Sequence, residues 1–129
     1  MRIMGHGIDL VEITRIAHML ETHGERFLAR CFTAGEQAYA EQSHRLRAER
    51  YAARFAAKEA VLKALGTGWR DGIAWTDVDV TRDPAGQPGV RLSGRSAQIA
   101  RERGITGWLL SLSHSDSHAI ASALAVGNG

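Results

Sequence analysis

An α+β fold is predicted by the order of hydrophobic patterns along the 129-residue sequence. The first half combines one short strand pattern with several helical patterns, and the second half alternates strand-like segments with turn residues and one helix. Such segregation of helices from antiparallel strands is typical of this class. The length corresponds to a single domain, residues 1–129, with a modest core to which oligomerisation would add buried surface.

The opening strand and the first helices are predicted from apolar spacing. Residues 2–10 read as a strand whose C-terminal end presents Asp9. Apolar residues at helical intervals predict a helix over residues 13–23, which Gly24 would end, followed by a short helix over residues 26–31.

The middle of the chain is predicted to hold the longest helix. Thr33 and Glu36 have the spacing of a capping box, which predicts a helix from residue 34 to about 41. An alanine-rich pattern predicts a second, longer helix from about residue 46 to 65, with Gly66 as its C′ residue.

The second half is predicted to be mostly strands. The predicted elements are strands over residues 75–82, 90–92, 108–112 and 118–126, a turn over 83–86, and a helix over 96–103. Ser96 would cap this helix and Gly104 would end it. The last two strands would be joined by a loop over residues 113–117, and residues 127–129 would fray.

Composition and charge exclude several classes of protein. Lys and Arg number 16 against 14 acidic residues, a formal charge of +2, and no aromatic residues interleave with the basic ones as in nucleic-acid binding proteins. No apolar run approaches the ~18 residues of a membrane span, and the N-terminus lacks a signal-peptide core. We therefore expect a cytoplasmic protein that engages neither nucleic acid nor a membrane.

Zinc and thiol chemistry are also excluded. The single cysteine, Cys31, cannot form an intramolecular disulfide, and its surroundings indicate a small buried apolar residue. The six histidines show no zinc-ligand spacing. The arginines form two groups, Arg26 with Arg30 and residues 45–54, which suit phosphate or carboxylate partners but are equally typical of a solvated helix face.

A small set of polar residues is compatible with phosphate chemistry. Glu59 and Lys63 are four residues apart on the long helix and share a face, although surface pairs of this kind are common. Gly66, Thr67 and Gly68 follow, with backbone amides that could lie against phosphate oxygens. Asp9 and Glu59 together match the preference of Mg²⁺ for few protein carboxylates, several waters and substrate phosphates.

Three segments resemble the signatures of one family, the holo-acyl-carrier-protein synthases. Residues 5–13 (GHGIDLVEI) look like the N-terminal signature, residues 54–68 (RFAAKEAVLKALGTG) like the central one, and residues 111–115 (SLSHS) like the C-terminal one. Phe32-Thr33 with Glu36 is similar to a weaker fourth feature. The segments occur in the family's order and span nearly the whole chain.

The resemblance implies a fold and a set of site residues. The fold is the 4'-phosphopantetheinyl transferase fold, an antiparallel sheet packed with one long helix and several short ones, in a homotrimer with active sites between subunits. The implied Mg²⁺ ligands are Asp9 and Glu59, and Lys63 would contact phosphate. Residues implied to lie at coenzyme A are Gly66, Thr67, Gly68 and His114, and those at an acidic carrier-protein helix are Arg15, Met19, Arg26 and Phe27.

The implied reaction moves 4'-phosphopantetheine from coenzyme A to a serine of apo acyl carrier protein, for fatty acid or polyketide synthesis. Adenosine 3',5'-bisphosphate would leave, and Glu59 is the candidate general base. Two alternatives stay open from the residues: a relative that binds coenzyme A or nucleotides without transfer, and a small basic module that binds an acidic protein or nucleic acid, of which the mild net charge disfavours nucleic acid. An activity assay separates both from the enzyme.

Overall fold

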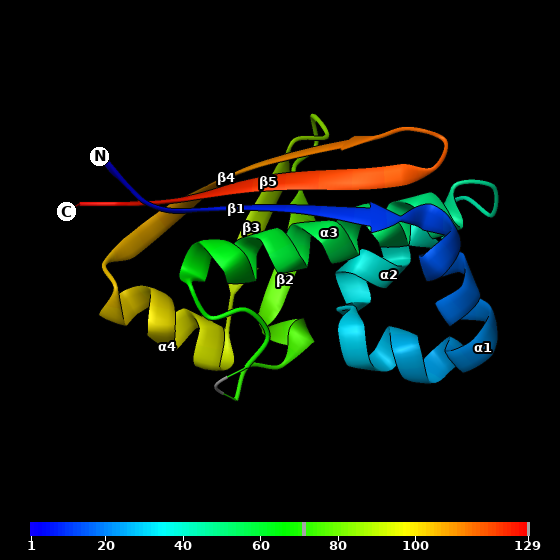
Figure 1. The fold of residues 1–129 in the computed structure, drawn as a ribbon, viewed down its shortest axis with the longest axis horizontal. Helices are drawn as coiled ribbons and strands as arrows, with labels where there is room; N and C mark the ends of the chain where they lie inside the picture. Colours follow the sequence, from blue (N-terminus) through cyan, green and yellow to red (C-terminus); the bar gives the residue numbers. More distant parts are fainter. Residues whose placement is uncertain (71, 129) are drawn as a thin grey trace.

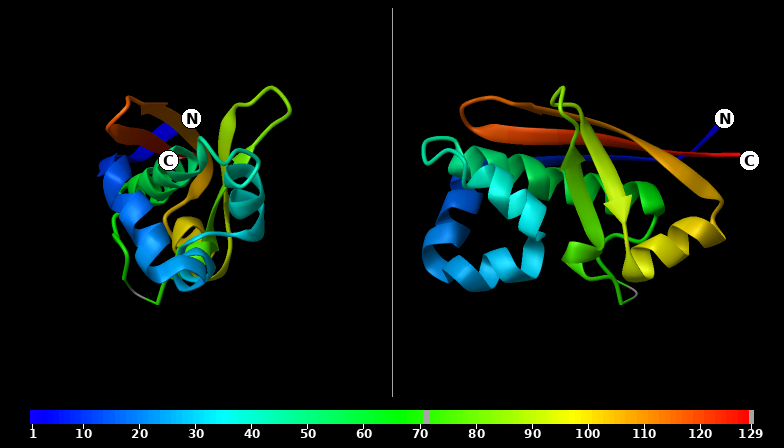
Figure 2. Two further views of the ribbon diagram at one scale, coloured as in Figure 1. Left: turned by 90° about the vertical axis from the view of Figure 1, so that its right-hand side faces the viewer. Right: turned by 180° about the vertical axis from the view of Figure 1, so that it is seen from behind.

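A three-stranded antiparallel sheet lies along one long helix, and a two-stranded sheet crosses the flank of that helix (Figures 1 and 2). The computed structural model describes residues 1–70 and 72–128. In chain order the elements are β1 (Arg2–Glu12), α1 (Ile13–Cys31), α2 (Ala34–Ala40), α3 (Arg47–Leu65), the 3₁₀ helix η1 (Trp75–Asp77), β2 (Val78–Arg82), β3 (Pro88–Leu92), α4 (Gly94–Glu102), β4 (Ile105–His114) and β5 (His118–Gly127). The predicted α+β class is confirmed.

The larger sheet has the order β1-β5-β4, so the last strand of the chain lies in the middle. Its inner face consists of small residues: Ala119, Ala121, Ala123 and Ala125 are all buried against α3. Its outer face carries exposed apolar side chains, namely Ile3, Ile8, Leu10 and Leu109. One face of the sheet is therefore packed and the other is uncovered in a single chain.

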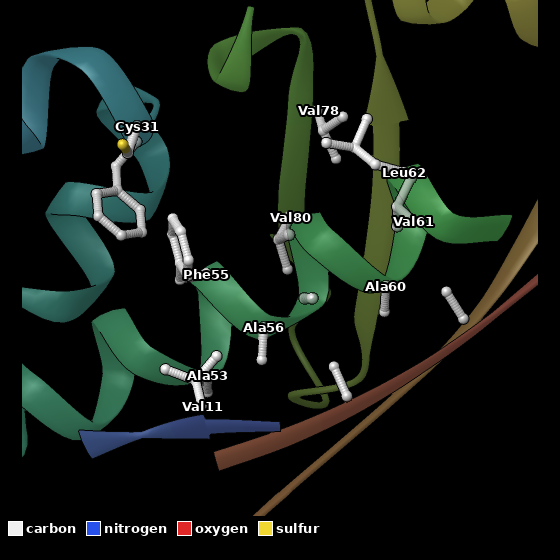
Figure 3. Close-up of a cluster of buried hydrophobic side chains, with 14 of the residues drawn as sticks. Val11, Cys31, Ala53, Phe55, Ala56, Ala60, Val61, Leu62, Val78 and Val80 are labelled. Carbon is white, nitrogen blue, oxygen red and sulfur yellow. The ribbon is translucent and has the colours of Figure 1, made fainter. Parts of the chain in front are cut away.

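Helix α3 is the centre of the core, and most of its residues are buried. Figure 3 shows Phe55 pointing towards Cys31, and Val61 and Leu62 lying on the side of Val78. The alanines of α3 remove side-chain bulk, which lets the helix pack closely against strands on more than one side. The predicted burial of Cys31 is confirmed.

Local sequence signals set several element ends. The backbone of Gly24 is not helical (φ 43°, ψ −122°), so the predicted break divides α1 into two helical parts. Thr33 and Glu36 form the predicted capping box at the start of α2. Gly66 ends α3 in the left-handed conformation (φ 84°), as predicted for a C′-type glycine.

Three predictions for the second half are wrong. Trp75 lies in η1, because the chain makes a tight turn before entering β2 at Val78. Ser93 precedes α4, whereas Ser96 lies inside it and its hydroxyl donates to the carbonyls of Asp77 and Ser93. Gly127 is not frayed, because it pairs with Arg2 and Ile105. Residue 129 lies outside the described residues.

A buried ion pair connects α2, α3 and β2. The side chains of Glu36 and Lys58 are both fully buried, with Oε1 and Nζ 2.8 Å apart. Glu36 also accepts from the backbone N–H of Val80, and Lys58 donates to the carbonyls of Trp75 and Val78. Burial raises the pKa of Glu36 and lowers the pKa of Lys58, since it disfavours both charged forms.

Candidate functional site

Two glycines of β1 allow the backbone of α3 to lie directly on the strand. A Cβ added to Gly5 would overlap the carbonyl oxygen of Ala64, and one added to Gly7 would overlap that of Ala60. No residue with a side chain fits at either position without displacing the helix. This close approach places the next inward-facing residue of β1, Asp9, against the C-terminal half of α3.

Lys63 is anchored on the Asp9 segment of β1. Its ammonium donates to Oδ1 of Asp9 at 3.1 Å and to the carbonyl oxygen of Ile8 at 2.9 Å. The Asp9 side chain is 11% exposed and the Lys63 side chain is 51% exposed. The lysine therefore neutralises part of the Asp9 charge while its end stays open to solvent.

Glu59 lies beside Asp9, one helical turn before Lys63. Burial raises the pKa of Glu59 to about 6, helped by the Asp9 charge and by a hydrogen bond with Asp9, against the lowering effects of Lys63 and Arg15. That hydrogen bond needs one carboxyl to be protonated. When both are ionised neither can donate, and the buried Oδ2 of Asp9 has no hydrogen-bond partner among the described residues.

The paired carboxylates fit a magnesium ion. Neighbouring carboxylates, with one oxygen buried without a donor, are the environment that a hard divalent cation satisfies. No cluster of three or more His, Cys, Asp or Glu side chains suited to a metal occurs among residues 1–70 and 72–128. A Mg²⁺ ion held by two carboxylates would take its remaining ligands from water and substrate oxygens, as is usual for this ion.

The Gly66–Gly68 turn differs from its predicted use. The backbone N–H of Gly66 donates to Lys63, and those of Thr67 and Gly68 donate to Leu62. These three amides complete the end of α3, so donation to phosphate is not available to them in this conformation. Thr67 is buried and its hydroxyl donates to the carbonyl of Gly68.

A small pocket opens beside the two catalytic candidates on α3. It measures about 170 Å³, and Glu59, Leu62, Lys63, Gly68, Trp69 and Trp75 line it. The rings of Trp69 and Trp75 stack with centroids 5.5 Å apart. Of the predicted turn residues, Gly68 lines this pocket together with Glu59 and Lys63.

His114 does not join this group within one chain. It is the last residue of β4, not a loop residue as predicted, and its Nδ1 lies 3.5 Å from Oε1 of Glu49. Glu49 precedes Glu59 by ten positions on α3, which separates the two by roughly 15 Å along the helix axis. A single chain thus places the predicted coenzyme A residues at two separate locations.

The pocket at His114 is rich in arginine. It measures about 490 Å³, and its lining includes Arg50, Arg54 and Arg82. All three guanidinium groups lie over the ring of Tyr39, at 4.3, 4.3 and 4.6 Å from its centroid. Such a concentration of fixed donors suits a phosphate or another anion.

Arg54 is the most unusual member of this pocket. It is 5% exposed, and its Nε atom is buried with no hydrogen-bond partner among the described residues. Burial lowers the pKa of its guanidinium. In the sequence, the four-residue spacing of Arg50 and Arg54 is compatible with a phosphate site and with a solvated helix face alike. No sequence pattern indicates that Tyr39 and Arg82 join them.

The residues expected to meet a carrier protein lie on α1. Arg15 is near enough to Glu59 to lower its pKa. Met19, Arg26 and Phe27 line a pocket of about 510 Å³ together with Trp69 and Trp75. Phe27 is only 6% exposed, because its ring packs against Phe32 and Phe55. A partner protein could therefore contact no more of Phe27 than the edge of the ring that faces the pocket.

Comparisons with known proteins identify the family. Residues 5–123 match the model of the 4'-phosphopantetheinyl transferase superfamily. The chain is 52% identical over 125 residues to a holo-[acyl-carrier-protein] synthase of Desulforudis audaxviator, covering 97% of this chain and 94% of the relative.

Solved structures give the same result at the level of the fold. The holo-[acyl-carrier-protein] synthase of Neisseria meningitidis superposes with a TM-score of 0.87 at 30% identity, covering 97% of this chain and 99% of that one. The Bacillus anthracis holo-(acyl-carrier-protein) synthase, solved with coenzyme A (3',5'-ADP), gives 0.80 at 33% identity, covering 98% of both chains. With its antiparallel sheets around α3 and its Asp9–Glu59–Lys63 group, this chain belongs to the 4'-phosphopantetheinyl transferase superfamily.

Proposed function

We propose that this protein transfers 4'-phosphopantetheine from coenzyme A to a serine of an apo acyl carrier protein, releasing adenosine 3',5'-bisphosphate. The convergence of Asp9, Glu59 and Lys63, from segments about fifty residues apart, carries the proposal. A relative named holo-[acyl-carrier-protein] synthase, 52% identical over 97% of this chain, supports it. A solved relative in complex with coenzyme A supports the donor.

Asp9 and Glu59 would hold Mg²⁺, which when bound neutralises charge on the diphosphate of coenzyme A. Lys63, already beside Asp9 and half open to solvent, would donate to a phosphate oxygen and stabilise the charge that grows there. The serine oxygen forms a bond to the phosphorus that carries pantetheine, and the bond from that phosphorus to the adenosine bisphosphate breaks.

Glu59 is the candidate for the serine proton. Burial and the neighbouring Asp9 raise the pKa of Glu59 to about 6 in the metal-free site. With Mg²⁺ bound, Glu59 would act as the base through the carboxylate oxygen that does not hold the metal. The proton would pass from the serine to Glu59 directly or through one water molecule.

A homotrimer with active sites between subunits would unite the two separated groups. The His114 pocket, with Arg50, Arg54 and Arg82, would then supply anion contacts to the nucleotide half of coenzyme A held at Asp9 of a neighbour. The uncovered apolar face of the sheet, with Ile3, Ile8, Leu10 and Leu109, supports such packing. The separation of His114 from Glu59 within one chain supports it as well.

The carrier would approach over α1 through its acidic helix. Arg15, near Glu59, and Arg26, at the pocket that includes Met19, would meet carboxylates of that helix. Carrier and coenzyme A are both cytoplasmic substrates, so the protein would act in the cytoplasm. No helix among the described residues is long and apolar enough to cross a membrane.

One experiment tests the function directly. The protein is mixed with apo acyl carrier protein, coenzyme A and Mg²⁺, and the carrier is weighed by intact-mass spectrometry. We expect a gain of one phosphopantetheine per carrier, and no gain with EDTA or with the Asp9→Asn variant. An unchanged mass across several carriers, with folded protein that still binds coenzyme A, would indicate a relative that binds without transferring.

A further inference from the structure

A histidine lies near the middle of the apolar outer face of the larger sheet. His6 is exposed, and its Nε2 lies 3.4 Å from the hydroxyl oxygen of Ser122 on the neighbouring strand β5. Side chains alternate between the two faces of a strand, so His6 shares the outer face with the exposed residues Ile8, Leu10 and Leu109. The face therefore places an ionisable group among apolar side chains.

The side chains around His6 carry no charge. By strand pairing and alternation, its neighbours on this face among the described residues are Ile8 on β1, Ser122 and Leu124 on β5, and Leu109 and Ser111 on β4. Glu12 and His118 oppose each other at the far end of the face, roughly 20 Å from His6 along the strand, and Arg2 lies roughly 13 Å away in the other direction. Within the described chain, no carboxylate on this face is close enough to stabilise a charged imidazole.

The positions of the two half-sites indicate what covers this face. Asp9 belongs to β1 and His114 ends β4, and these strands are the two edges of the sheet. Helix α3 packs on the inner face, which leaves the outer face open (Figures 1 and 2). Copies that close into a ring with their outer faces towards a common axis would bring β4 of each beside β1 of the next. Further copies of this chain are therefore the partners that unite Asp9 with His114.

Assembly of this kind would remove His6 from water. Ser122 lies on the central strand β5, so its hydroxyl and the imidazole beside it would approach the axis together with their counterparts from the other copies. A neutral imidazole keeps its hydrogen bond with Ser122 there. A protonated imidazole would place a charge in an apolar interface beside like charges, and both desolvation and repulsion oppose that state.

We infer that His6 makes subunit assembly depend on pH, with protonation of its imidazole driving the subunits apart. The inference rests on the proposed function, in which the site is shared between subunits, and adds the regulation of that site by acid. The separated chain exposes His6 and binds the proton more readily than the assembled chain, so protons favour dissociation by linkage. The stabilisation of the assembly is therefore full at high pH and is lost as the pH falls through the range in which histidine becomes charged, about pH 8 to 5.

Sedimentation equilibrium over a series of protein concentrations tests the inference. We expect the dissociation constant of the wild-type assembly to rise at least about tenfold between about pH 7.5 and about pH 5.5. His6→Leu has a side chain of similar size that cannot be protonated, so it should stay assembled at both pH values. His118→Leu, the same change at the far end of the same face, should dissociate as wild type does. Equal assembly of wild type and His6→Leu at the lower pH would overturn the inference.

A permanent charge at the same position gives a second test that needs no change of pH. His6→Lys should sediment as a monomer under both conditions, while its circular dichroism spectrum matches that of wild type. Because the monomer lacks half of the shared site, its transfer activity should fall with its assembly. A His6→Lys variant that assembles as tightly as wild type would contradict the burial of His6 between subunits.

The two proposals fail in different ways. If wild-type protein adds no phosphopantetheine to any carrier at neutral pH, the proposed function is lost, whatever its assembly. If wild type transfers normally and its assembly does not change between the two pH values, the function stands and only the role of His6 is rejected.

Discussion

Gly7 faces the carbonyl oxygen of Ala60 so closely that a Cβ on the strand would overlap it. We therefore predict that Gly7→Ala lowers the free energy of unfolding by about 3 kcal/mol, because overpacking must push α3 away from β1. The displacement would also separate Asp9 from Glu59 and reduce transfer. Urea unfolding measures the effect, and Gly35→Ala is the matched control because its Cβ meets nothing within 4 Å. Equal stability of the two variants would contradict the packing described.

Replacing Glu59 by glutamine should separate turnover from binding. Glutamine has similar size but accepts no proton as a base, so we predict a fall in kcat of at least about 100-fold. Coenzyme A binding should weaken much less, because Asp9 and Lys63 remain. Single-turnover assays and calorimetry with coenzyme A measure the two effects. Normal turnover by Glu59→Gln would remove the residue from both of its proposed roles.

The raised pKa of Glu59 predicts a pH dependence of stability in the metal-free protein. Its pKa is about 6 in the fold, against an ordinary 4.5. The folded state therefore binds this proton more tightly than the unfolded state, and the resulting stabilisation is full below the ordinary value and lost as the pH rises through about 6. Relative to Glu59→Gln, wild type should lose stability between pH 4.5 and about 6.5. Urea unfolding in EDTA tests this, and a pH-independent difference would contradict it.

The Glu36–Lys58 pair should show strong coupling. Lys58→Met leaves a fully buried carboxylate without its cation and should cost about 3–5 kcal/mol of unfolding free energy. Adding Glu36→Gln removes that charge while keeping an acceptor for Val80, so the double variant should be less destabilised than the sum of the single variants. Additive losses in urea unfolding would show that the pair is not coupled.

Mixed oligomers test whether the site is shared between subunits. Glu59→Gln and His114→Ala homo-oligomers should each have reduced activity. When the two variants are unfolded together and refolded, some interfaces combine intact Glu59 from one subunit with intact His114 from the next. Activity should then rise towards about a quarter of wild type for random mixing. Activity that stays at the mean of the two variants would place each complete site within one chain.

The sequence predicted those features that depend on local chemistry. The capping box of Thr33 and Glu36, the break at Gly24 and the end of α3 at Gly66 all follow from interactions within a few residues. Motif resemblance predicted the convergence of Asp9 with Glu59. The alanines of α3 suggested close approach, and the glycines opposite them in β1 complete it.

Local sequence patterns did not predict the contacts between residues that are far apart in the chain. Nothing near Tyr39 in the sequence indicates that arginines from α3 and β2 gather over its ring. Likewise, the amides of Gly66, Thr67 and Gly68 look free in the sequence, and only the path of the turn directs them to Leu62 and Lys63. The partners of β5 depend on contacts across the whole chain, which periodicity does not encode.

The central position of β5 also bears on how the chain reaches this fold. β1 pairs with β5 alone in the described sheet, with Glu12 opposite His118 and Arg2 opposite Gly127. As the polypeptide emerges from the ribosome, β1 has no strand to pair with until β5 is made. Final assembly of the sheet must therefore follow synthesis of β5, and loops this long slow the search for the native pairing. A nascent chain that stalls within β5 would expose both β1 and β4 as open edges, prone to aggregation.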